Sequence, residues 1–137
     1  MKLSILAAMG SAMLLTGCAT CDLTAKSTYA DGNSLMGEWK LFTAQGQAIE
    51  NAEMMFSAEG KMAGGNGCNR FFGDFSVQGQ QLTLTPQGMT QMMCHGDALT
   101  NEKEIMEALP EVHHAVVTDH GIALQNQQGT VLLNLRR

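Results

Sequence analysis

Short apolar segments that alternate with turn residues dominate the chain from residue 35 onward. Residues 82–85 read Leu-Thr-Leu-Thr, and residues 71–77 place Phe71, Phe75 and Val77 on one face. Such period-two patterns, separated by turn residues roughly every ten positions, are typical of antiparallel strands joined by short connections. Pro86 is expected to end its strand. We expect strands at residues 35–42, 54–57, 62–65, 71–77, 82–85, 115–118, 122–125 and 130–135.

The period of the pattern changes once, between residues 97 and 109. Ala98, Glu102, Ile105 and Leu109 fall near helical spacing, and Pro110 stops the run. One helix inserted after the fifth strand predicts an α+β domain. In such a domain the helix covers or plugs a small, strongly curved antiparallel sheet with the shape of a barrel.

The amino terminus has the pattern of a bacterial export signal. Residues 3–17 carry no charge, are too short and too interrupted for a membrane-spanning helix, and lead into Cys18. Leu-Thr-Gly-Cys at residues 15–18 resembles a lipobox, where the cysteine becomes lipidated; ordinary secretion with a free thiol is the alternative. We expect three parts, which are a signal peptide at residues 1–17, a lipidated terminus and flexible tether at residues 18–34, and one domain at residues 35–137.

The charge of the chain and its expected location limit the kinds of partner it can bind. Without Lys2 the 8 basic residues become 7, against 13 acidic ones, which argues against a nucleic-acid partner. Ala19 after the cysteine, rather than aspartate, favours the outer membrane. We therefore expect a monomer that contacts the membrane through its lipid anchor, faces the periplasm and binds an envelope protein or a small ligand.

Cysteine usage follows from this location. Lipidation of Cys18 would leave the apparent Cys-x-x-Cys with Cys21 unable to bind metal or exchange thiols. In an oxidising periplasm, Cys68 and Cys94 are expected to form a disulfide. The pair closes a loop of 94 − 68 = 26 residues, which stabilises a fold by about 3 to 4 kcal/mol in the chain-entropy model. Cys21 is then the odd thiol, with no assigned role.

Two segments resemble a known family. Residues 67–73 read Gly-Cys-Asn-Arg-Phe-Phe-Gly and residues 90–94 read Thr-Gln-Met-Met-Cys. With the helix before Pro110 and the closing hairpin, they are similar to the META domain, in particular to the HslJ-type heat-shock lipoproteins. The resemblance implies a strongly bent sheet, an envelope location, and a role in stress response and in tolerance of the antibiotic novobiocin. It implies no catalytic residues, and Gln91 departs from the arginine that relatives often carry.

The bend around Cys68 carries the candidate recognition residues. Asn69 and Arg70, beside two phenylalanines, are candidates for an edge that binds a protein or an anionic ligand. The alternative is that Arg70 is structural and bonds nearby carbonyl groups.

Soft donors gather near Cys94. Thioethers, a thiol and an imidazole in one segment suit Cu(I), whereas methionines beside a disulfide also fill irregular cores. We favour the second interpretation and expect no metal and no cofactor. The donors are Met89, Met92, Met93, Cys94 and His95.

No catalytic pattern accompanies these segments. Ser57 and Ser76 lie in no nucleophile motif, and the glutamates around Lys103 are typical of a solvated helix face. The leading hypothesis is a non-catalytic envelope lipoprotein that acts in stress response and novobiocin tolerance, by binding a partner or by maintaining the envelope. The alternative is a periplasmic small-ligand or copper carrier.

Overall fold

The computed structural model describes residues 28–137, so the predicted signal peptide, Cys18 and Cys21 lie outside the described residues. Eight strands and one main helix make up the described chain. In order, the elements are α1 (Gly32–Leu35), β1 (Gly37–Ala44), β2 (Gln47–Phe56), β3 (Lys61–Asn66), β4 (Arg70–Gln78), β5 (Gln81–Met89), α2 (Asp97–Ala108), a 3-10 turn (Leu109–Glu111), β6 (His114–Thr118), β7 (Gly121–Gln125) and β8 (Val131–Arg136).

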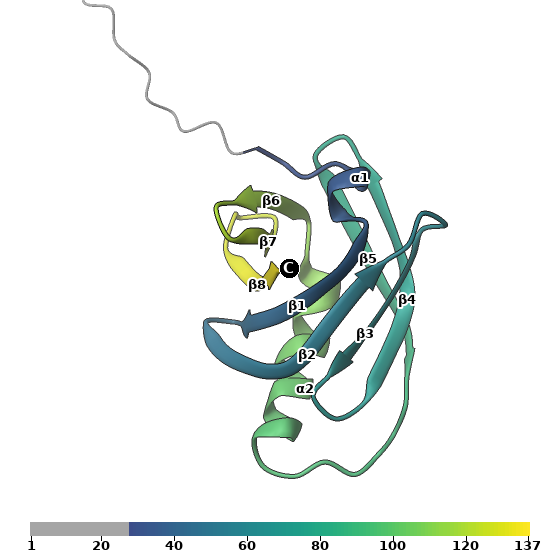
Figure 1. Cartoon of the computed structure of the whole chain (residues 1–137), viewed down its shortest axis with the longest axis vertical. Helices are drawn as coiled ribbons and strands as arrows, with labels where there is room; N and C mark the ends of the chain where they lie inside the picture. Colours follow the sequence, from purple (N-terminus) through teal and green to yellow (C-terminus); the bar gives the residue numbers. More distant parts are fainter. Residues whose placement is uncertain (1–27) are drawn as a thin grey trace, which may run out of the picture.

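The strands form one antiparallel sheet in the order β5-β4-β3-β2-β1-β8-β7-β6. The sheet curls into a half-barrel, and α2, which follows β5, lies against β1, β3 and β8 (Figure 1). The two edges of the sheet meet at one point, where the amide of Leu82 donates to the carbonyl of His113 over 2.8 Å. The prediction of an α+β fold with one helix after the fifth strand is confirmed.

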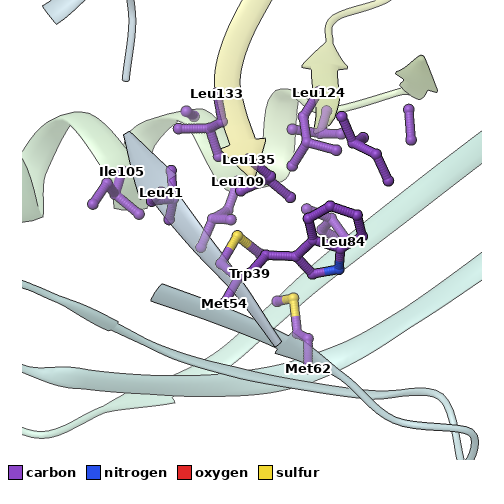
Figure 2. Close-up of a cluster of buried hydrophobic side chains, with 14 of the residues drawn as sticks. Trp39, Leu41, Met54, Met62, Leu84, Ile105, Leu109, Leu124, Leu133 and Leu135 are labelled. Atoms are coloured by element: carbon purple, nitrogen blue, oxygen red, sulfur yellow. The ribbon is translucent and has the colours of Figure 1, made fainter. Parts of the chain in front are cut away.

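The concave face of the sheet and the helix share one apolar core. Strand residues alternate between buried and exposed positions, as period-two patterning requires. Phe71 and Phe75 are buried as predicted, and Ile105 of α2 and Leu109 are fully buried. Figure 2 shows Ile105 and Leu109 among side chains from both halves of the sheet. The helix thus plugs the curl and shields its inner face from water.

Two strands are longer than the sequence predicted. β5 continues through Pro86 to Met89 because it is an edge strand, where a missing N–H removes no ladder hydrogen bond. β2 begins at Gln47 rather than Met54. Its first half has an irregular alternation of buried and exposed residues, with Asn51 at φ 60°, so period-two reasoning missed it.

The folded domain begins before residue 35. The last part of the predicted tether at residues 18–34 therefore belongs to the domain. Tyr29 forms a β-bridge with Val116 of β6, and the amide of Ala30 donates to the carbonyl of Ala115 over 2.8 Å. Asp31 then caps α1 by accepting from the amide of Ser34 over 2.7 Å. Residues 28–30 therefore cover the β6 edge and residues 31–34 begin α1, although their polar composition suggested a linker.

The helical region ends as its sequence predicts. α2 ends at Ala108, and Pro110 lies in the single 3-10 turn that follows. Among residues 28–137, no helix is both long enough and apolar enough to cross a membrane.

Candidate functional site

The first candidate region, the stapled corner, joins residues 66–70, residues 90–94 and Glu102. A disulfide links Cys68 to Cys94 with their Cα atoms 6.0 Å apart, which confirms the predicted pair. The bend before it uses Gly67, whose φ of +91° favours glycine. The fully buried Asn66 accepts from the amides of Cys68 and Asn69 through its Oδ1.

Asn69 is the centre of the stapled corner rather than an exposed recognition residue. Only 3 % of its surface is accessible, which corrects the prediction. Its Oδ1 accepts from the hydroxyl of Thr90 and from the amide of Met92, over 2.9 and 2.7 Å. Its Nδ2 donates to the carbonyl of Met92 and to Glu102. A buried amide that uses both of its ends fixes the loop to the sheet and to the helix.

Glu102 is the residue of this corner that sequence reasoning missed. We expected a solvated helix face, but its Oε2 lies 2.7 Å from the Nδ2 of Asn69 and 3.7 Å from the Sγ of Cys94. Ligand atoms of Glu102 and the two cysteines lie within 4.8 Å of one another. Metal binding requires thiolates, and both sulfurs are engaged in the disulfide, so the oxidised corner offers one carboxylate only.

The soft donors do not converge. The Sδ of Met89 accepts from the Nδ2 of Asn66 over 3.2 Å and packs at the border of the core. Met92 and Met93 are 64 % and 87 % exposed, so core filling holds for Met89 and is wrong for these two.

The second candidate region, the outer groove, lies on the outer face of the sheet. It is a hollow of about 690 Å³. Successive register partners place five residues in one row across β8, β1, β2, β3 and β4. They are Arg136, Lys40, Glu53, Gly65 and Arg70.

Local irregularities shape the outer groove. Phe42 is an extra residue of β1 against β8, between the pairs that Leu41 and Thr43 make. Opposite it, Asn51 of β2 has a positive φ. Gly65 has no side chain to fill the row, and bulges of this kind bend strands and re-aim side chains next to functional sites. The hollow is therefore built by the backbone.

Charged groups of the outer groove are only partly paired. Arg70 Nη1 lies 3.3 Å from Glu53 Oε1, so Arg70 bonds a carboxylate and not the carbonyl groups considered above. Arg136 lies over the ring of Phe42, 4.7 Å from its centroid. Within residues 28–137, Lys40 makes no ion pair shorter than 4.0 Å.

An apolar row runs beside the charged one. Met55, Ala63 and Phe72 are successive register partners on β2, β3 and β4. Met55 and Phe72 are 43 % and 53 % exposed, and the Phe72 ring lies over Gly88 of β5. The outer face thus offers charge and apolar surface side by side.

A curled eight-stranded antiparallel sheet, plugged by one helix and closed at a corner by a disulfide, defines a class of small α+β domain, and no helix of residues 28–137 covers its outer face. The family model of the META domain matches residues 33–137, and the chain belongs to this family.

One solved structure, an NMR structure, is similar in fold to the chain with a TM-score of 0.55 and 23 % sequence identity. The match covers 77 % of this chain and 94 % of that one. The search among curated proteins found no match.

Proposed function

We propose that this protein is a non-catalytic envelope lipoprotein that acts by binding. The outer groove is the observation that carries the proposal, because it joins a backbone-built hollow to charged side chains on one open face. Among the described residues that line it there is no serine, histidine or free thiol to serve as nucleophile or base. Lys40, Arg70 and Arg136 are groups that bind and orient a partner.

The location completes this proposal. Leu-Thr-Gly-Cys at residues 15–18 supports lipidation of Cys18 and a position on the periplasmic face of the outer membrane. The wild-type chain should incorporate labelled palmitate supplied to cells. The labelled protein should then sediment with outer-membrane vesicles. Cys18→Ser is the control, and equal labelling of both chains would contradict the anchor.

Membership of the META family supports a role in the stress response and in novobiocin tolerance. Deleting the gene from its bacterium should increase killing by novobiocin after a heat shock, and the wild-type gene should restore survival. A variant of the outer groove, Lys40→Gln with Arg136→Gln, should fail to restore it at equal protein level. Full restoration of survival by this variant would show that the outer groove is not needed for novobiocin tolerance.

A small-ligand carrier remains the second candidate, and the outer groove favours it over copper because the methionine sulfurs do not converge. Equilibrium dialysis of the oxidised protein against Cu(I) tests the copper version. Stoichiometric uptake would revive it.

A further inference from the structure

Within the described part of the chain, two cations of the outer groove face each other and share no anion. Lys40 and Arg136 are direct register partners on β1 and β8, and both side chains lie on the outer face. Like charges directly opposite each other across a sheet are destabilising. Arrangements that oppose stability concentrate at functional sites. An anion seated between the two would relieve the repulsion.

The acidic neighbours do not supply that anion. Glu53 faces Lys40 in register, but its Oε1 is 3.3 Å from the guanidinium of Arg70. Glu50 also lines the groove but makes no ion pair within the described residues. The groove therefore contains three cations and two anions in a chain of net charge −5. The groove therefore carries an excess of positive charge, although the whole sequence is acidic.

Gly65 lies between Glu53 and Arg70 in the row and adds no side chain of its own beneath the ion pair that joins them. The hollow of about 690 Å³ falls within the range of small-molecule sites. Beside it, Met55, Ala63 and Phe72 offer apolar surface to the rest of a ligand.

We propose that the outer groove binds an amphiphilic anion, a phosphate or carboxylate carried on an apolar body. The anionic group lies between Lys40 and Arg136, and the body extends beside the Glu53–Arg70 ion pair toward Met55 and Phe72. This inference rests on the proposed binding function and names its ligand class, but it does not require the lipid anchor. A soluble phosphate ester and the headgroup of an anionic lipid share the required chemistry.

The test uses the full chain in a neutral detergent and follows backbone amide resonances by NMR. Phenyl phosphate carries both parts of the proposed ligand, inorganic phosphate carries the charge alone, and phenol carries the ring alone. We expect the amides of Phe42, Gly65 and Gly67 to shift with phenyl phosphate at the lowest concentration. Mixed micelles with phosphatidylglycerol, compared with phosphatidylcholine, distinguish a lipid headgroup from a soluble ester.

Matched variants separate the groove from general charge. Lys40→Gln with Arg136→Gln should weaken phenyl phosphate binding by about tenfold for each charge-assisted bond lost. Lys61→Gln with Lys103→Gln removes the same charge from sites outside the groove, and binding should stay within about twofold of wild type, because surface charges are screened. Both double variants should unfold near the wild-type temperature, because all four side chains are exposed.

Three results would overturn the inference. They are no shift of the groove amides at millimolar phenyl phosphate, equal weakening by the two double variants, and phenol acting as strongly as phenyl phosphate. A shift by phosphatidylglycerol supports the inference with a lipid source. A shift by phenyl phosphate alone supports it with a soluble source. Failure of Cys18 lipidation would leave all these results unchanged, so the anchor and the ligand are tested separately.

Discussion

The stapled corner and the amino-terminal seam hold the chain together in different ways. We define the seam as residues 28–35, which pair with β6 and form α1. The corner uses a disulfide and the buried amide of Asn69, which bonds to Thr90, Met92 and Glu102. The seam uses backbone pairing, one exposed helix cap and the indole of Trp39, whose Nε1 donates to the carbonyl of Leu35 over 2.7 Å.

The difference separates two tasks. The corner fixes a long loop to the sheet and to the helix, so any loss there frees residues far apart in the chain. The seam adds a segment to an existing edge, so any loss there stays local. We therefore expect the corner to contribute to global unfolding and the seam to open first.

Breaking the disulfide should give the largest effect. Cys68→Ser with Cys94→Ser should lower the free energy of unfolding by about 3 to 4 kcal/mol, because the unfolded chain regains the entropy of a 26-residue loop. Urea unfolding monitored by Trp39 fluorescence measures it. A thiol reductant should destabilise the wild type by a similar amount and leave the double variant unchanged. A loss below about 1 kcal/mol would show that the hydrogen bonds hold the corner alone.

Removing the central amide should come next. Asn69→Ala should cost about 2 to 3 kcal/mol, because it leaves partly buried partners unsatisfied. Asn69→Asp keeps the shape but places a carboxylate against Glu102, and Glu102→Gln should restore part of the loss. A double-mutant cycle by chemical denaturation measures this coupling. A coupling free energy of zero between Asn69 and Glu102 would show that Glu102 does not stabilise the corner through Asn69.

The seam should respond more weakly. Ala30→Pro removes the amide that donates to Ala115, at a cost of about 1 kcal/mol. Hydrogen exchange should then show lost protection at Val117, whose amide donates to Thr28, while Leu124 in β7 stays protected. Ala30→Gly keeps the N–H, adds no polar group at this buried position and serves as the control. Uniform loss of protection across the sheet would make the seam part of the global unit.

The smallest effect should be acid-dependent. Hydrogen bonds from the side chain and then the backbone of Ser34 lower the pKa of Asp31 below 3.8. The stability that the cap contributes is therefore present above pH 3.8 and is lost as the pH falls through the lower folded value. The amide shift of Ser34 should follow that titration, and Asp31→Asn should abolish it. An unchanged titration in this variant would assign it to another group.

The strand pattern and the helix were predictable from local sequence. Alternation in residues 71–77 and helical spacing up to Leu109 each depend on neighbours along the chain. Pro86 was misjudged because its effect depends on whether the strand lies at an edge, and that is a property of the whole sheet. Residues 28–34 were misjudged because backbone pairing leaves little mark on composition.

The two candidate regions also differ in how far local sequence could predict them. The cysteine pair was predicted from the expected periplasmic location and the cysteine count, and the structure confirms the pair. Asn69 and Glu102 are 33 positions apart in the sequence, and no local periodicity predicts their hydrogen bond. The row from Arg136 to Arg70 exists only after strand order and register are known. Arg70 was singled out, whereas Lys40 and Arg136, which lie in the same row, were not.

The covered edge strand has a consequence for crowding. Residues 28–30 occupy the open side of β6, and Pro86 removes a donor from β5 at the other edge. Free strand edges invite pairing between molecules, and proline and covering segments prevent it. If lipidation of Cys18 places many copies on one membrane surface, collisions between them are frequent and similarly oriented. A sheet with both borders blocked can be packed densely on that surface without polymerising through its strands.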